Sequence, residues 1–433
     1  MGILVGLLLL SALMVIHELG HFLVGRALGF AIEEFAIFMG PVLFSWNRKG
    51  IRYSIRLFPI GAFVRFSGEE RRDDTDKSDN PALFHRRPRW ARALVIGSGP
   101  VINLLAGVAA FAILFTSYGF TTTTVDQVAD GSQAATAGIR SGDRIVMANG
   151  AHVATTVDYS VELELAGVSK PVELVVRDAA GTERTALLEP VIRDVYRLGV
   201  TSLGPLEEGG REILTVDPES NGGNPVLAVG DRLLAVDGIP VENLEAMTLR
   251  IQESAGGSLR VTVLRNGESL DLDMVSTKYR EGNPRGLSFT TTGGFFPGVG
   301  EAFRNAYSVV KLTFRSLSMI LTGAIRPQDS LTGPIGIIDT IGSVVNDGQP
   351  AWIKIYQLLS LFALISVNLG VFNLLPVPAL DGSQLILIGI EGLRGGKRLP
   401  AKLETAILIS GFALIIMLAV VGLVFDVMRI LAR

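Results

Sequence analysis

Four long apolar stretches constrain this chain more than any other feature of its sequence. Each is close to the roughly 20 residues that a helix needs to cross a bilayer. With 48% hydrophobic and 19% charged residues and a mean hydropathy of +0.42, the chain is too apolar for an ordinary soluble domain. We therefore expect a multi-pass α-helical membrane protein with four transmembrane helices, at 1–25, 93–118, 356–382 and 404–428.

Basic residues near the ends of these stretches predict their orientation, because cytoplasmic loops are enriched in Lys and Arg. The loop at 26–92 ends in four arginines, and the loop between the third and fourth stretches is also basic. Both loops are therefore expected on the cytoplasmic side, and residues 119–357 on the other side. Arg429 and Arg433 conflict mildly with this orientation. The first stretch lacks a basic leader and a cleavage site, so we expect it to be a retained helix.

Charge and cysteine content exclude several classes of function. The formal net charge is only −3, so nothing indicates nucleic acid as a partner. The chain has no cysteine, which excludes disulfides and thiolate metal sites. Only four histidines are present, at positions 17, 21, 85 and 152, and two of them fall within five residues.

The region between the second and third stretches is polar, glycine-rich and full of short alternating segments, which is typical of β structure. It also repeats itself. The sequence GDRIVMANGAHV begins at Gly142 and GDRLLAVDGIPV begins at Gly230. Both resemble PDZ domains, so we expect two β-rich PDZ domains, at 122–196 and 198–292. PDZ domains bind peptide C-termini by adding a strand to a sheet edge, and the alternative here is a spacer or size filter.

Residues 299–323 carry apolar side chains at spacings of three and four, with Arg304, Lys311 and Arg315 on another face. This pattern predicts an amphipathic interfacial helix that lies on the membrane surface. The alternative is a helix that faces the core of the soluble part.

The sequence HELGH places His17, Glu18 and His21 inside the first apolar stretch. Residues i and i+4 share one face of a helix, so both imidazoles can bind one zinc ion, and Glu18 can act as the base toward a water molecule. Such H-E-x-x-H spacing is a metalloprotease signature. Ionisable groups are rare in membrane helices, which favours a functional role over an interhelical polar cluster.

A catalytic zinc site usually takes three protein ligands. His85 lies in a basic loop and His152 in a predicted β hairpin, so we expect a carboxylate as the third ligand. Asp381 follows the apolar part of the third stretch, after two prolines that break the helix. The predicted orientation brings Asp381 and the histidines to a similar depth. The alternative for Asp381 is a plain helix cap.

Three motifs together resemble those of the site-2 proteases, a family of intramembrane zinc metalloproteases. They are HELGH in the first stretch, GPVINLLAG in the second and NLLPVPALDG in the third. The resemblance implies that His17, His21 and Asp381 bind one Zn2+ and that Glu18 is the catalytic base. It further implies regulated intramembrane proteolysis of single-span membrane proteins, namely a pre-cleaved anti-sigma factor or remnant signal peptides. The expected location is the bacterial cytoplasmic (inner) membrane, with the PDZ domains on the periplasmic side and the active site near the cytoplasmic side.

Further residues are candidates for holding an unwound substrate. Residues 50–66 alternate apolar and polar side chains and predict a membrane-associated β-hairpin beside the active site, where family members have a membrane-associated β loop. Its candidate substrate-binding residues are Ile55, Leu57 and Gly61. Asn103 and Asn373 are polar groups in apolar stretches, and they bind either substrate or a neighbouring helix. Gly99, Ala106 and Gly107 are expected only to allow close helix packing.

Two other functions compete with this interpretation. One is a membrane-anchored PDZ scaffold with a structural or inactive metal site, which would have no need of Glu18. The other is a protease of soluble substrates, which the position of His17 and His21 within an apolar stretch disfavours.

Overall fold

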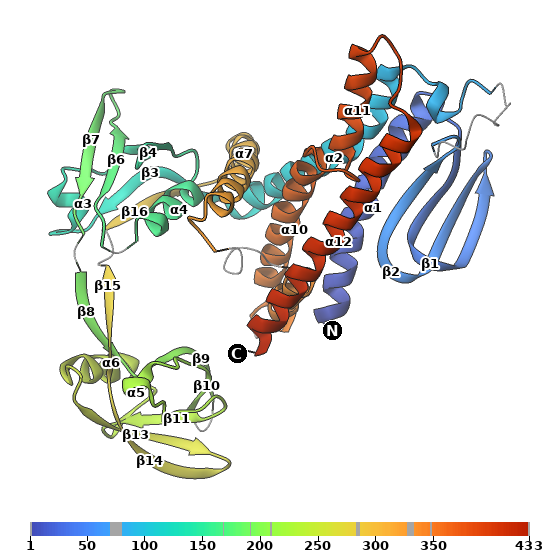
Figure 1. The fold of residues 1–433 in the computed structure, drawn as a ribbon. Helices are drawn as coiled ribbons and strands as arrows, with labels where there is room; N and C mark the ends of the chain where they lie inside the picture. Colours follow the sequence, from blue (N-terminus) through green and yellow to red (C-terminus); the bar gives the residue numbers. More distant parts are fainter. Residues whose placement is uncertain are drawn as a thin grey trace. The chain divides into compact units, whose positions relative to one another are not determined.

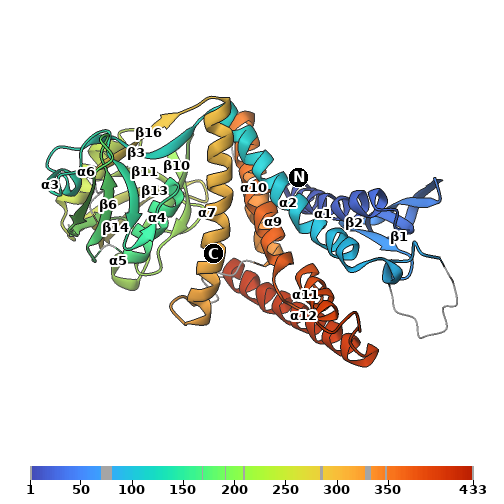
Figure 2. The ribbon, with the colours of Figure 1, turned by 90° about the horizontal axis from the view of Figure 1, so that it is seen from above.

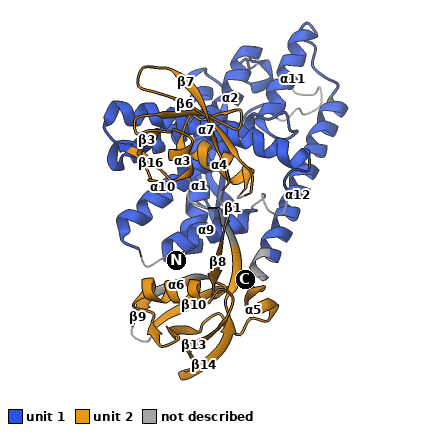
Figure 3. Cartoon of the chain, turned by 90° about the vertical axis from the view of Figure 1, so that its left-hand side faces the viewer, with its two compact units in different colours: residues 1–122, 291–432 blue, residues 123–290, 433 orange. Residues whose placement is uncertain are grey.

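The computed structural model describes residues 2–69, 80–167, 169–190, 192–207, 210–282, 286–326, 333–346 and 349–431. They form two compact units, which Figure 3 colours separately. Unit 1 comprises Met1–Thr122 and Thr291–Ala432, and unit 2 comprises Thr123–Thr290. Residues 70–79 of the predicted loop at 26–92 lie outside the described residues.

Four helices of unit 1 are long and apolar enough to cross a membrane (Figure 1). They are α1 (Gly2–Ala27), α2 (Arg89–Tyr118), α10 (Ala351–Leu374) and α12 (Ala401–Leu431). With 30 residues, α2 is about 45 Å long, which matches a bilayer with its headgroups. Trp90 and Tyr118 are exposed near its two ends, where interfacial aromatic residues are enriched. The four predicted apolar helices are confirmed.

Helix α2 is the centre of unit 1 and contacts α1, α7, α10 and α11. Figure 2 shows α2 and α10 running side by side. Glycines allow this close approach. A Cβ at Gly107 would meet the Val367 side chain and Ala363 O, and one at Gly370 would lie 2.8 Å from Pro100 O. The packing role predicted for Gly107 is therefore confirmed.

The third predicted membrane segment, 356–382, contains more than one helix. α10 ends at Leu374 because Pro376 lacks a backbone N–H and restricts Leu375 to an extended conformation. A second helix, α11 (Asp381–Leu393), then begins at Asp381 itself. Neither α11 nor α9 (Pro334–Asn346) was expected from the sequence, because apolar runs of 13 residues do not by themselves distinguish a helix from a strand.

Helix α7 (Phe295–Leu321) begins four residues before the predicted amphipathic segment and ends two residues before its end. Its buried side includes Glu301, Ala302 and Ser308 and packs against α2 and α10. The exposed large apolar side chains of the predicted stripe are Phe303, Tyr307, Phe314 and Leu321.

Asp426 of α12 is a buried carboxylate that caps a different helix. Its Oδ1 accepts a hydrogen bond from Gly333 N (3.0 Å) and its Oδ2 accepts one from Gly336 N (2.9 Å). These backbone groups lie at the start of α9, where helix N–H groups have no partner within the helix. The carboxylate therefore joins α12 to α9 within apolar surroundings.

A sheet follows α1, formed by β1 (Ile32–Arg48) and β2 (Ile51–Phe66). The predicted hairpin segment 50–66 is thus one strand, and its partner at 32–48 was not predicted. Both strands bend. Phe35 pairs with both Tyr53 and Val64, whereas Phe44 pairs with Ile55. Four segments therefore lie side by side in the order 62–66, 32–37, 51–56 and 42–48, and segment 62–66 is at one edge.

Unit 2 contains two similar sheets. The first β module has the strand order β16-β3-β4-β6-β7, with β5 paired to β4, and the second has β14-β13-β11-β10-β9, with β12 paired to β11. The strands are β3 (Phe120–Val128), β4 (Arg144–Ala148), β5 (Ala151–His152), β6 (Val172–Arg177), β7 (Glu183–Leu188), β9 (Val200–Glu207), β10 (Gly210–Val216), β11 (Arg232–Val236), β12 (Ile239–Pro240), β13 (Ser258–Arg265), β14 (Glu268–Val275) and β16 (Leu287–Thr292). Short helices accompany them: α3 (Gln133–Thr136) and α4 (Thr156–Ala166) in the first module, and α5 (Ser220–Gly223) and α6 (Leu244–Glu253) in the second. The paired strands β8 (Ile192–Arg197) and β15 (Thr277–Gly282) connect the two modules.

The second module is inserted into the first. Strand β16 follows the second module in the chain but pairs with β3 of the first. Strand β16 therefore takes the place in the first module that β9 takes in the second. Just before β16, Gly286 O accepts from Ala129 N (2.8 Å), and just before β9, Gly199 O accepts from Asp217 N (2.7 Å). The sequence analysis placed residues 287–292 in the second module, and the pairing of β16 with β3 assigns them to the first.

The repeated Gly-Asp-Arg sequence supplies a buried carboxylate to each module. Asp143 pairs with Arg184 and accepts from Arg140 N, while Asp231 pairs with Arg265 (2.7 Å) and accepts from Ala228 N (2.8 Å). The Arg265 guanidinium, and then the Ala228 N–H, lower the pKa of Asp231 below its ordinary value despite its burial. Asp231 is therefore bound in its ionised form.

A pH dependence follows from the lowered pKa of Asp231. The ionised Asp231 stabilises the folded module. This stabilisation is complete above the pKa of Asp231 in the unfolded chain, near 3.8, and is lost as pH falls through the lower pKa of Asp231 in the folded state. We expect hydrogen-exchange protection of β11, corrected for intrinsic rates, to decrease between about pH 5 and about pH 3. The decrease should be smaller in Asp231→Asn. An equal decrease in both proteins would contradict the assignment.

Candidate metal centre

Helix α1 brings His17 and His21 to one face. They are four residues apart, which is about one helical turn, and their ring centroids lie 4.8 Å apart. His21 is 8% exposed. Burial of two imidazoles in so apolar a helix needs compensating partners.

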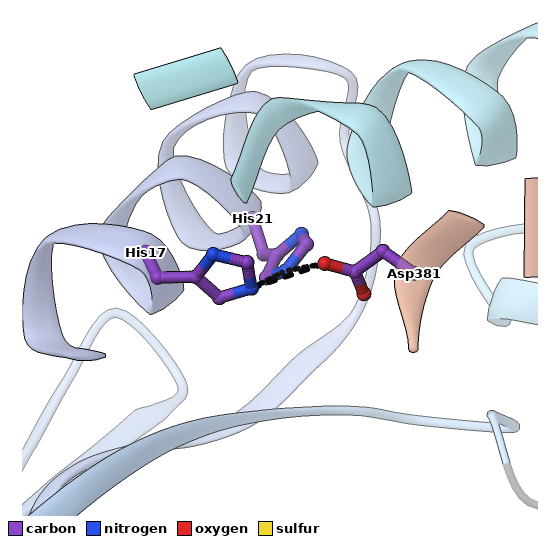
Figure 4. Close-up of side chains that lie close together, drawn as sticks. All are labelled: His17, His21 and Asp381. Atoms are coloured by element: carbon purple, nitrogen blue, oxygen red, sulfur yellow. Dashed lines mark hydrogen bonds and ion pairs between the residues drawn. The ribbon is translucent and has the colours of Figure 1, made fainter. Parts of the chain in front are cut away.

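Asp381 approaches from a different element (Figure 4). The segment after α10 turns at Ala379, which has φ 74°, a conformation that costs a non-glycine residue about 1 kcal/mol or more. Helix α11 begins at Asp381, and the carboxylate points toward both imidazoles. Gly411 of α12 packs directly against Pro378, and a Cβ at Gly411 would collide with this proline.

The three side chains form a compact set of ligand atoms. Asp381 Oδ2 lies 3.0 Å from His17 Nε2 and 3.6 Å from His21 Nε2, and the two Nε2 atoms are 3.2 Å apart. A tetrahedral zinc ion with ligand distances of about 2.1 Å holds its ligands about 3.4 Å apart. The observed spacings fit such an ion. Among the described residues, this is the one group of three or more His, Asp or Glu side chains that could hold a metal.

Two further observations fit a bound cation. Asp381 Oδ2 is buried and faces both Nε2 atoms, and among the described residues no further group donates a hydrogen bond to it. Gly99 of α2 lies against the two rings, and a Cβ there would collide with both His17 and His21. Gly99 therefore does more than allow helix packing, because it leaves room for the rings themselves.

The second nitrogen of each imidazole is also bonded. His21 Nδ1 lies 2.8 Å from Val95 O, to which it donates, so Nε2 carries the free lone pair. His17 Nδ1 lies 3.3 Å from Asn103 Nδ2 and 3.4 Å from Asn373 Nδ2. Asn103 Oδ1 is buried without a partner among the described residues. A flip of that amide, which exchanges N and O, makes Asn103 the acceptor for His17.

Glu18 reaches the β sheet. Its Oε2 accepts a hydrogen bond from Val64 N at 3.1 Å. Because this N–H points to Glu18, it is directed away from the partner strand, so Val64 presents the outer edge of segment 62–66. The sequence analysis did not single out Val64, since no local pattern identifies the strand residue that meets a distant helix.

The other predicted substrate residues lie elsewhere in the same sheet. Ile55 pairs with Ile37 and Phe44, and Leu57 is 48% exposed. Gly61 has φ 81°, and a Cβ there would lie 3.1 Å from Met39. The segment that bonds to Glu18 is instead 62–66, directly after Gly61.

A cavity of about 1040 Å3 adjoins this edge. Its walls include Val64 and Phe66 of β2, Gln384 and Ile388 of α11, and Leu408 of α12. Space for a chain segment thus exists beside the strand that contacts Glu18.

The role of Gly99 can be tested against a glycine two residues away. Alanine at position 99 would strengthen the helix but collide with the imidazoles, so we expect Gly99→Ala to lose most of its bound metal. Gly97→Ala is the matched control, because a Cβ at Gly97 meets nothing within 4 Å. The measurement is zinc content of the purified proteins by elemental analysis. Full zinc occupancy in Gly99→Ala would contradict the geometry described here.

Comparison with known proteins agrees with this geometry. Residues 5–418 match the family described as peptidase family M50. The chain is 29% identical over 419 residues to the regulator of sigma-E protease of Escherichia coli, covering 89% of this chain and 90% of that protein. It is 27% identical over 452 residues to a candidate zinc metalloprotease of Vibrio cholerae, covering 97% of each chain.

Proposed function

Because the chain belongs to peptidase family M50, the site-2 protease family, we propose that it cleaves single-span membrane proteins inside the bilayer. It is a zinc metalloprotease of the site-2 type. The observation that carries the proposal is the meeting of His17, His21 and Asp381 among helices apolar enough to span a membrane.

In the proposed mechanism His17, His21 and Asp381 hold one zinc ion. Zinc bound there supplies a Lewis acid that polarises the scissile carbonyl and acidifies a water molecule. Glu18 accepts the proton of the attacking water and passes it to the leaving amine. The hydrogen bond from Val64 N holds the Glu18 carboxylate in place.

The edge of segment 62–66 is the proposed docking strand for substrate. A helical substrate hides its peptide bonds in i to i−4 hydrogen bonds, so it must unwind before hydrolysis. An extended segment can add to a strand edge through backbone hydrogen bonds. A segment added beside Val64 would pass Glu18 and enter the cavity lined by Val64 and Phe66.

The remaining candidate residues take different roles in this proposal. Asn103 is fully buried, which supports orientation of His17 rather than substrate contact. Asn373 is partly exposed and remains the candidate for an unwound backbone or the oxyanion. Ile55, Leu57 and Gly61 belong to the sheet that presents the docking edge, and we propose that its exposed apolar residues contact lipid.

The cellular setting is likewise proposed. Basic loops support a bacterial inner-membrane orientation with the site near the cytoplasm and unit 2 on the periplasmic side. We assign the two β modules as PDZ domains that bind peptide ends or exclude bulky ectodomains. The exposed apolar stripe of α7 supports a membrane-surface position. A trimmed anti-sigma factor and remnant signal peptides are the proposed substrates, since one relative is named a regulator of sigma-E protease.

Cleavage of a single-span model substrate in detergent tests the proposed function. We expect the wild type to cut within the span, and a zinc chelator to abolish the cut. Glu18→Gln should retain zinc but lose at least about 100-fold in rate, because it can no longer accept a proton. Product masses locate the cleavage site.

Each outcome of this experiment bears on a different part of the proposal. Cleavage that persists in Glu18→Gln would contradict the role of Glu18 as the proton acceptor. Cleavage only of soluble peptides, with intact membrane substrates untouched, would overturn the intramembrane assignment.

The hydrogen bond from Val64 N to Glu18 can be tested by removing its donor. Proline is tolerated at an edge where the N–H is not part of the ladder, but it removes the donor to Glu18. Val64→Pro is therefore expected to keep zinc and to cleave about tenfold more slowly or worse. Val64→Ala keeps the N–H and serves as the control. Equal rates in both variants would exclude the hydrogen bond from the mechanism.

A further inference from the structure

Helix α11 carries Asp381, and its Leu385 and Ile388 pack against the hydrophobic cluster that includes Val95 and Ile96 of α2. Only Gly382 and Ser383 of its 13 residues are buried. It contacts α2 and α10. A Cβ at Gly382 would collide with Leu374 O and Leu375 O, which fixes the beginning of the helix close to the end of α10. The far end of the helix has a second, polar anchor, which includes a contact from Arg89 Nη1 to Glu391 O (3.4 Å).

Glu391 supplies that anchor. Arg92 Nη2 lies 2.7 Å from Glu391 Oε1 and 2.8 Å from Oε2, so one nitrogen bridges both carboxylate oxygens. The Arg92 side chain is 6% exposed and that of Glu391 is 11% exposed. Arg398 approaches Glu391 Oε2 at 3.4 Å and donates to His85 O at 2.9 Å. The last turn of α11 is therefore tied to α2 by a pair with little exposed surface, which lies in the wall of the cavity that Val64 and Phe66 also line.

The same part of α2 holds the other half of the metal centre. Val95, one turn beyond Arg92, accepts the hydrogen bond from His21 Nδ1. Gly99, one further turn along, lies against both imidazoles. Arg92, Val95 and Gly99 lie on three successive turns of α2. They contact Glu391, the Nδ1 of His21 and the two imidazole rings, respectively.

We propose that Arg92 and Glu391 are positioning residues that hold Asp381 in register with His17 and His21. Asp381 and Glu391 are about 15 Å apart along the helix, so the pair acts through the position of α11 and touches no reacting atom. The inference rests on the proposed role of Asp381 as a metal ligand. It adds that a contact at the opposite end of α11 sets the position of Asp381.

Metal release from the full-length protein in detergent tests this proposal. The readouts are the rate at which a chromogenic chelator removes zinc, and the visible absorption of the Co2+-substituted protein. We expect Glu391→Gln to release zinc about tenfold faster and to alter the cobalt spectrum, as for residues that orient metal ligands. Arg92→Lys keeps the charge but loses the Nε–H that donates to Arg87 O (3.2 Å) and orients the guanidinium, and it should act in the same direction.

Glu34→Gln is the matched control. Glu34 is also a buried carboxylate of unit 1, 5% exposed and paired with Arg56 at 2.9 Å, but it lies in β1 and does not anchor α11. We expect Glu34→Gln to lower the melting temperature while its zinc release and cobalt spectrum stay as in the wild type. If all variants differ only in melting temperature, the Arg92–Glu391 pair is merely structural and the proposal is overturned.

Asp381→Ala separates this inference from the proposed site. If Asp381→Ala releases zinc at the wild-type rate, the assigned ligand set fails. If Asp381→Ala accelerates release but Glu391→Gln and Arg92→Lys do not, the ligand set stands and only the positioning role fails. Glu391→Asp provides a folded alternative should Glu391→Gln misfold, because it keeps the charge and shortens the anchor by one methylene. Wild-type zinc release in Glu391→Asp and Arg92→Lys together would likewise overturn the positioning role.

Discussion

The burial of ionisable groups among apolar helices is the constraint on which the rest of unit 1 depends. His17, His21 and Asp381 would each be costly in such surroundings if they lacked partners. They lie close enough to share one cation, and His21 bonds to Val95 O. Helix α2 makes this possible, because Gly99 leaves room for both rings. The contacts that offset the burial of these groups are thus the contacts that build the candidate metal centre.

Local spacing was sufficient to predict which side chains meet. His17 and His21 are four residues apart in one apolar helix, and Asp381 follows prolines that end another. The structure brings the three into a group that could hold a metal. The four apolar helices could be predicted for the same reason, since length and hydropathy are local properties. The repeated Gly-Asp-Arg sequence likewise predicted two similar β modules, each of which buries its aspartate in a salt bridge.

Long-range contacts could not be predicted in this way. Arg92 and Glu391 are 299 residues apart in the chain, and no local pattern pairs one with the other. Val64 meets Glu18 only because β2 bends at Gly61 and brings a new segment to the edge of the sheet. Ile55 and Leu57 precede this bend, and their contact with substrate stays a prediction. Strand β16 completes the first module only after the second has been inserted, which no local pattern reveals.

The most direct test of the account is X-ray absorption at the zinc edge of the purified, zinc-loaded protein. The geometry predicts a zinc ion with two imidazole ligands and oxygen donors, because His17 Nε2, His21 Nε2 and Asp381 Oδ2 are the atoms within reach of one another. His21→Gln should remove one imidazole contribution from the spectrum. A wild-type spectrum without imidazole scattering, or one unchanged by His21→Gln, would contradict the assigned metal centre.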